Sequence, residues 1–333
     1  MVSLGGLVPR RALFKALGLV AVLGLAGPVA VAPAAAQTPK KLQIVATTGM
    51  IADAVRQVGG ERVAVEALMG PGVDPHLYRQ TRSDIARMTR ADAVIWHGLY
   101  LEAQLEEFFA DLARRKKVVA LGEQIEKGKL LDHDDYKGRF DPHVWMDPRL
   151  WRDVVVAARN TLATLDPTGQ PVFEANAARH LAEIDRLAAY AEVVLSSVPQ
   201  SARVLVTAHD AFNYFGRAYG FEVLGIQGIS TESEAGLKQI ETFVNTLVER
   251  KIKAVFVESS VADRNVRALI EGAAARGWSV AIGGELYSDA MGETGTYEGT
   301  YIGMIDHNVT TIARALGGTV PAKGMNERLA AVR

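Results

Sequence analysis

Two histidines of this chain stand in matching turns that suit the binding of a metal ion. His76 and His143 each follow an Asp-Pro pair and precede an aliphatic and an aromatic residue, in Asp74-Pro-His-Leu-Tyr78 and Asp141-Pro-His-Val-Trp145. Proline fixes its own φ and restricts the residue before it, so each imidazole is carried by a stiff turn with little freedom. A stiff turn of this kind is a good place for a metal ligand.

A third histidine and a carboxylate complete the candidate set. His209 follows the apolar run 204–208, which is typical of a buried strand, and α/β folds place ligand groups at strand ends. Asp289 lies in the glycine-containing loop 283–292. The four residues are 67, 66 and 80 positions apart along the chain, so only the fold can assemble them. We predict a metal site of His76, His143, His209 and Asp289, with Glu258 accepting a hydrogen bond from a ligating imidazole.

The remaining chain alternates predicted strands and helices, which indicates parallel sheets with right-handed crossovers. Residues 171–198 have no glycine or proline after the first position and predict one helix about 42 Å long at 1.5 Å per residue. We therefore predict an α/β fold of two parallel-sheet lobes joined by one long rigid helix. The predicted boundaries are 37–167 for the first lobe, 168–199 for the helix and 200–333 for the second lobe. Each lobe supplies two site residues, so the site is expected between the lobes.

The first 36 residues have the pattern of a cleavable signal peptide. Arg10, Arg11 and Lys15 precede the apolar run 16–26, and small residues end at Ala34-Ala-Ala36. The arginine pair also matches a twin-arginine export signal. Because the chain contains no cysteine, it has no residue for lipid attachment. These features predict an exported periplasmic protein that is not a lipoprotein.

Composition and charge narrow the possible partners. Hydrophobic residues make up 49% of the chain, enough for substantial cores. Without residues 1–36, 34 basic residues face 38 acidic ones, a formal charge of −4. This balance argues against a polyanion-binding surface, and we predict no nucleic-acid partner.

Other histidines are expected to play smaller parts. His180, among Ala, Arg and Glu of the long helix, is predicted to face solvent, and His97 to line the site. The segment Asp132-His-Asp-Asp135 is predicted to be a surface loop, with a minor role in metal capture as the alternative.

Taken together and in this order, five segments resemble the solute-binding proteins of zinc and manganese ABC importers, known as cluster A-I. These are Gly72-Val-Asp-Pro-His76, Asp141-Pro-His-Val-Trp145, Thr207-Ala-His-Asp-Ala-Phe-Asn-Tyr-Phe215, Phe256-Val-Glu-Ser-Ser260 and Gly284-Glu-Leu-Tyr-Ser-Asp289. The resemblance implies two α/β lobes bridged by one long helix and a single buried metal ion held by His76, His143, His209 and Asp289. It also implies a monomer that delivers its ion to a membrane permease and performs no chemistry.

The donor set favours zinc, with manganese as the open alternative. In the family that the chain resembles, many manganese or iron members carry glutamate where this sequence has His209, whereas zinc members often have a His-rich loop that is short here. An exported zinc hydrolase, which needs an open coordination position, is one rival interpretation. A binder of siderophores or corrinoids is another, and would need cationic or aromatic groups. Because imidazoles bind metal only when neutral, affinity is expected to fall below pH about 6.5.

Overall fold

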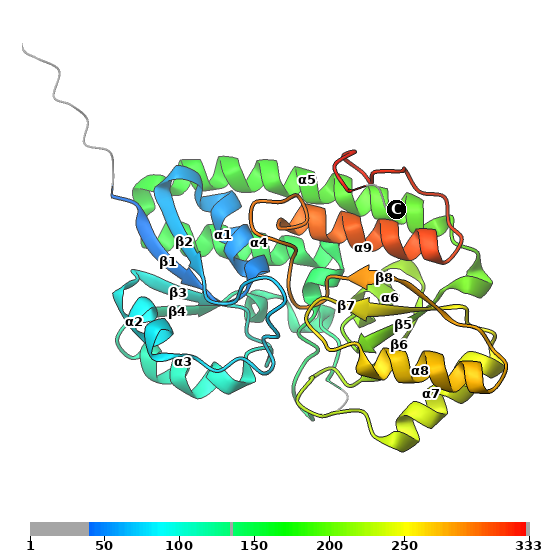
Figure 1. Ribbon diagram of the computed structural model, residues 1–333. Helices are drawn as coiled ribbons and strands as arrows, with labels where there is room; N and C mark the ends of the chain where they lie inside the picture. Colours follow the sequence, from blue (N-terminus) through cyan, green and yellow to red (C-terminus); the bar gives the residue numbers. More distant parts are fainter. Residues whose placement is uncertain (1–39, 134–135, 331–333) are drawn as a thin grey trace, which may run out of the picture. The chain divides into compact units, whose positions relative to one another are not determined.

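The computed structural model describes residues 40–133 and 136–330, which contain two α/β lobes (Figure 1). The predicted signal peptide lies outside the described residues. The first lobe is built on a parallel sheet in the order β2-β1-β3-β4. Its strands are β1 (Leu42–Ala46), β2 (Val63–Ala67), β3 (Ala93–Trp96) and β4 (Lys117–Ala120), and its helices are α1 (Gly49–Gly59), α2 (Arg82–Arg90) and α3 (Glu106–Ala113).

Two helices of the first lobe begin at capping side chains that the sequence supplies. Thr48 accepts a hydrogen bond from the backbone N–H of Ile51 at the start of α1. At α2, Thr81 and Asp84 form a reciprocal capping box. Each cap marks the point where the loop after a strand ends and the next helix begins. The loop between β2 and α2 carries His76.

Two helices follow the first sheet and lead into the second lobe. Helix α4 (Pro148–Leu165) starts with proline at its first position and with Asp147 as its N-cap. Helix α5 (Gln170–Ser196) has 27 residues, which gives about 40 Å at 1.5 Å per residue. It contacts α1 and α4 and also α9 (Tyr301–Ala315) of the second lobe. A single straight element thus spans both lobes, as predicted (Figure 1).

The prediction that His180 faces solvent is wrong. Its side chain is buried on α5, with 3% of its surface exposed. It belongs to a stripe of buried residues spaced three or four apart, which is the face of a helix that packs inward. That stripe consists of Phe173, Ala177, His180, Ile184, Leu187, Ala191 and Leu195.

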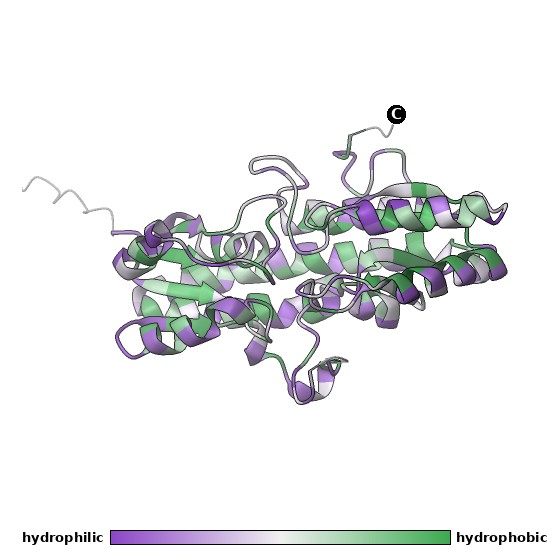
Figure 2. Cartoon of the chain, turned by 60° about the horizontal axis from the view of Figure 1, so that its bottom comes forward, coloured by the Kyte–Doolittle hydropathy of each residue, from purple (hydrophilic) through white to green (hydrophobic). Residues whose placement is uncertain are grey.

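The second lobe is also parallel α/β. Strand β5 pairs with β6, β7 pairs with β8, and β5 lies beside β7. The strands are β5 (Val204–His209), β6 (Glu222–Gln227), β7 (Ala254–Glu258) and β8 (Ala281–Leu286), and the helices are α6 (Asn213–Tyr219), α7 (Leu237–Glu249), α8 (Arg264–Ala275) and α9 (Tyr301–Ala315). Figure 2 shows hydrophilic and hydrophobic residues side by side along the helices, as expected where one helix face covers a sheet. Among the described residues, no helix combines the length and the apolar character needed to cross a bilayer.

Two features of the second lobe concern strand β8 and the loop before α7. Strand β8 has a register shift opposite Val255 and Phe256, which leaves Gly283 without a partner in β7. The loop before α7 reaches the first lobe, where Thr231 donates a hydrogen bond to Asp74.

Candidate metal centre

Four side chains from both lobes converge on one point, and they are the four predicted as metal ligands. His76, His143, His209 and Asp289 each offer one donor atom, and these atoms lie within 4.8 Å of one another. All four residues are buried, with at most 2% of their surface exposed. This arrangement places nitrogen and oxygen donors from distant parts of the sequence around one small volume.

Within residues 40–133 and 136–330, the donor atoms that face this point have no hydrogen-bond partner. They are Nε2 of the three histidines and both carboxylate oxygens of Asp289. Nε2 of His143 lies 3.3 Å from Oδ1 of Asp289, while Nε2 of His209 and of His76 lie 3.2 and 3.6 Å from Oδ2. Buried polar atoms are almost always satisfied, so five unsatisfied donors at one point indicate a missing partner. A cation bound among them would satisfy them all.

The two first-lobe histidines sit on turns closed by their own aspartates. Oδ1 of Asp74 accepts a 2.8 Å hydrogen bond from the backbone N–H of His76. Oδ1 of Asp141 accepts a 3.0 Å hydrogen bond from the backbone N–H of His143 and lies 2.7 Å from its Nδ1. With Nδ1 occupied in this way, the His143 ring turns Nε2 toward the centre.

Glu258 contacts both the backbone and the ring of the second-lobe histidine. His209 ends β5 and Glu258 ends the adjacent strand β7. Oε1 of Glu258 accepts a 2.9 Å hydrogen bond from the backbone N–H of His209, and Oε2 pairs with Nδ1 of the ring. A carboxylate on the far nitrogen fixes the tautomer and the orientation of a ligating imidazole.

Sequence reasoning missed Asp141 and Asn213 as supporting residues. The signal for Asp141 was available, because Asp commonly bonds the backbone two residues later and Asp-Pro-His occurs twice. Asn213 Nδ2 donates to Asp141 Oδ2 at 3.2 Å and to Asp210 Oδ2 at 3.0 Å. This amide joins the turn of His143 to the residue after His209, a link that spans 72 residues and appears only in the fold.

The charges of the centre are strongly coupled. Burial lowers the pKa of His76 to about 3, so this ring is neutral. Burial opposes protonation of His143 too, but the carboxylates of Asp141 and Asp289 prevail and raise its pKa to about 9. The pKa of His209 is likewise raised well above its ordinary value by Glu258 and Asp289, against the effect of burial. Burial also acts to raise the pKa of Asp289, yet His209 and His143 hold it well below its usual range.

Among the described residues, His97 and His133 are not part of the four-residue group. His97 is buried and its Nε2 lies 2.7 Å from the carbonyl oxygen of Pro142, so it supports the turn of His143 from behind. In the predicted surface loop, Asp132 is exposed but His133 is buried, with its ring 4.7 Å from that of Tyr136. The remaining two residues of that loop, 134 and 135, lie outside the described residues.

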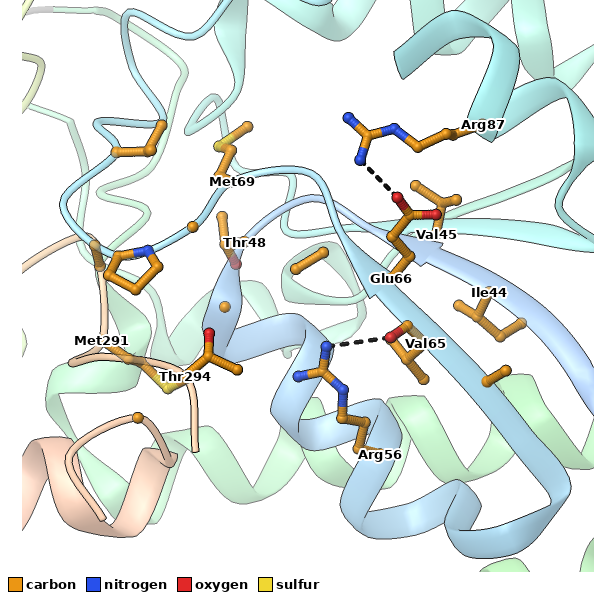
Figure 3. A pocket seen from close by; sticks show the side chains of 18 of the residues that line it. Ile44, Val45, Thr48, Arg56, Val65, Glu66, Met69, Arg87, Met291 and Thr294 are labelled. Carbon is orange, nitrogen blue, oxygen red and sulfur yellow. Dashed lines mark hydrogen bonds and ion pairs between the residues drawn. The ribbon is translucent and has the colours of Figure 1, made fainter. Parts of the chain in front are cut away.

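A cavity of about 580 Å³ borders the centre at Asp289. None of the three histidines lines it. Figure 3 shows Arg56 and Arg87 reaching strand β2, where Arg56 bonds the carbonyl of Val65 and Arg87 pairs with Glu66. The cavity therefore adjoins the loop that carries Asp289 and is not itself the metal centre.

Known proteins share both the sequence and the fold of this chain. It is 45% identical over 277 residues to the manganese-binding lipoprotein MntA of Bacillus subtilis, covering 83% of this chain and 90% of MntA. It is 46% identical over 273 residues to the zinc-binding protein TroA of Treponema pallidum, covering 82% and 88% of the two chains. The solved structure of TroA superimposes with a TM-score of 0.81 over 83% of this chain and 99% of TroA.

One prediction from the sequence is overturned by these relatives. MntA is named as a lipoprotein, and so is PsaA of Streptococcus mitis, which is 29% identical over 315 residues and matches 91% of this chain and 99% of PsaA. The prediction that this protein is not a lipoprotein relied only on the absence of cysteine from the 333 residues. That absence does not outweigh the lipoprotein relatives, for which a lipid anchor would keep the binder at the membrane, so we withdraw the prediction.

The match to a family model extends through both lobes. The model described as ZnuA, zinc-uptake complex component A, periplasmic, matches residues 44–315. That range runs from within β1 to the end of α9 and includes all four residues of the centre. The chain therefore belongs to the ZnuA family of metal-binding solute-binding proteins, together with MntA, TroA and PsaA.

Proposed function

We propose that this protein captures one divalent transition-metal ion between its lobes and delivers it to the membrane permease of an ABC importer. The ligands in this proposal are His76, His143, His209 and Asp289, and Glu258 orients His209. The observation that carries the proposal is the buried cluster of five donor atoms without hydrogen-bond partners. The metal is cargo, so the chain's own task is to bind, enclose and release it.

Zinc is the favoured cargo. Three imidazoles and one carboxylate form the nitrogen-rich, four-donor set that zinc accepts, and zinc also binds such sites more tightly than manganese does. Manganese is the second candidate, and two observations favour it. The relative MntA is named for manganese, and both oxygens of Asp289 face the histidines, so a fifth donor is within reach.

The same donor set supports a binding protein rather than a hydrolase. Four protein donors fill a tetrahedral shell, whereas a catalytic zinc site keeps one position open for water. The relatives of this protein are named for metal binding and uptake. A monomeric state and the absence of a nucleic-acid partner stay predictions from the sequence.

Titration of the metal-stripped protein tests the proposed function. We expect one equivalent of Zn²⁺ to bind, with Mn²⁺ binding the same site more weakly and being displaced by zinc. Competition against a chelator of known affinity, followed by elemental analysis of the washed protein, measures both quantities. Binding of neither ion would refute the proposal, and tighter binding of Mn²⁺ would reassign the cargo.

Acid should weaken binding over a higher pH range than the sequence suggested. Because the pKa of His143 is raised to about 9 and that of His209 is raised as well, the ion must displace protons from both rings at neutral pH. Affinity should therefore rise by about tenfold per pH unit for each proton displaced, from pH 6 to near 9. Chelator competition at several pH values, with proton release measured in unbuffered solution, checks this. Constant affinity between pH 7 and 9 would contradict it.

A further inference from the structure

One hydrogen bond connects the turn of a first-lobe ligand to the backbone beside a second-lobe ligand. Trp145 follows His143 by two residues, and its indole Nε1 donates to the carbonyl oxygen of Ser288 at 2.8 Å. That carbonyl belongs to the peptide bond between Ser288 and Asp289. Both Trp145 and Ser288 have no exposed surface, so water cannot replace this donor.

Trp145 is itself held firmly in place. Its ring lies 5.2 Å from the ring of His143 and 5.0 Å from that of His97, centroid to centroid. Its carbonyl oxygen accepts a 2.9 Å hydrogen bond from the hydroxyl of Tyr301, at the start of α9. An indole fixed on several sides is a rigid support for the peptide that it contacts.

The other hydrogen bonds of Tyr287 and Ser288 come from their own lobe. Asn308 on α9 binds Tyr287 at both backbone atoms, accepting from its N–H at 2.9 Å and donating to its carbonyl at 2.7 Å. The hydroxyl of Ser288 lies 3.0 Å from that of Ser260. These contacts fix the loop within the second lobe, whereas Trp145 fixes it relative to His143.

We propose that Trp145 is a positioning residue. It fixes the position of the Asp289 carboxylate relative to His143 and thereby sets the preference between zinc and manganese. The proposal relies on the metal-binding function proposed above. Zinc in a four-donor shell needs one oxygen of Asp289, while the harder manganese ion takes more oxygen donors and needs both. Both oxygens lie within 3.3 Å of a histidine nitrogen, and the bond from Trp145 holds the peptide that leads into Asp289. A displaced loop therefore weakens manganese binding more than zinc binding.

Trp145→Phe is the direct test, and Trp151→Phe is its matched control. Phenylalanine keeps an aromatic ring but removes the N–H, leaving the Ser288 carbonyl unsatisfied. Trp151 is also fully buried and stacks on Tyr301, yet its Nε1 has no hydrogen-bond partner in the described part of the chain. The two variants make the same chemical change, and only one of them removes a contact to the loop of Asp289.

The experiment measures Zn²⁺ and Mn²⁺ affinities of the stripped full chain by chelator competition, and dissociation rates by mixing the loaded protein with excess chelator. In Trp145→Phe we expect about a 10-fold loss for zinc and up to about 100-fold for manganese, mainly as faster dissociation. Tyr301→Phe, which removes the bond to the Trp145 carbonyl, should shift the zinc-to-manganese ratio in the same direction by less. Trp151→Phe should leave the ratio unchanged.

An unchanged ratio in Trp145→Phe, or an equal shift in Trp151→Phe, would overturn the proposal even if the affinities fall. A general loss of packing would affect both metals and both variants alike. Failure of the wild-type chain to bind either metal would instead refute the proposed function, so the two failures are distinguishable.

Discussion

Replacing His209 with alanine is expected to lower zinc affinity by on the order of 100- to 1,000-fold. Zinc sites with four protein ligands bind with about 10–16 kcal/mol, so one ligand accounts for roughly a quarter of that free energy. The variant should also be less stable, because Glu258 would then be buried without the imidazole that it pairs with. Chelator competition with the stripped protein measures the change directly.

Two further variants, a control and one with an intermediate effect, test whether the loss is specific to His209. His180→Ala removes an equally buried imidazole that lies on α5 outside the four-residue group, and should leave zinc affinity unchanged. Glu258→Gln keeps His209 but weakens the hydrogen bond that orients its ring. We expect this variant to lose about 10- to 100-fold in zinc affinity, more than His180→Ala and less than His209→Ala. An affinity in His209→Ala equal to that of wild type would remove His209 from the ligand set.

Zinc is expected to raise the melting temperature of the stripped protein by about 5–16 °C. At 100 to 1,000 times the dissociation constant, a ligand that binds only the folded state stabilises it by about 2.7–4.1 kcal/mol. Each kcal/mol shifts the midpoint by about 2–4 °C in domains of this size. The physical source of the effect is that the ion binds the three buried imidazole nitrogens and the buried, ionised carboxylate of Asp289.

Thermal unfolding with excess chelator and with added metal salts measures this shift. Mg²⁺ is the control ion, because it demands octahedral oxygen donors and should leave the melting temperature of the chelator-treated protein unchanged. The shift should also disappear in His209→Ala at the same zinc concentration. Equal melting temperatures with zinc and with chelator would mean that the folded state does not bind zinc preferentially.

The sequence was informative wherever the signal is local. The Asp-Pro-His turns, the strand that ends at His209 and the 27-residue helix were all readable, because proline restriction, apolar runs and helix breakers act over a few residues. Local signals failed where tertiary contacts outweighed them. His180 has polar neighbours in sequence but occupies a position in the buried stripe of α5.

The amino-acid sequence by itself determined which residue types are available for a metal and that they are carried by stiff turns and strand ends. Only the tertiary structure decided that four residues separated by more than 60 positions point their donors at one volume. It also decided which partners support them, since Asn213 and Trp145 act through contacts across 72 and 143 residues. The physical reason is that the direction of a metal-binding atom depends on the hydrogen bonds made by the rest of its side chain and by the neighbouring backbone. Those partners are brought together by packing between lobes, which no local pattern encodes.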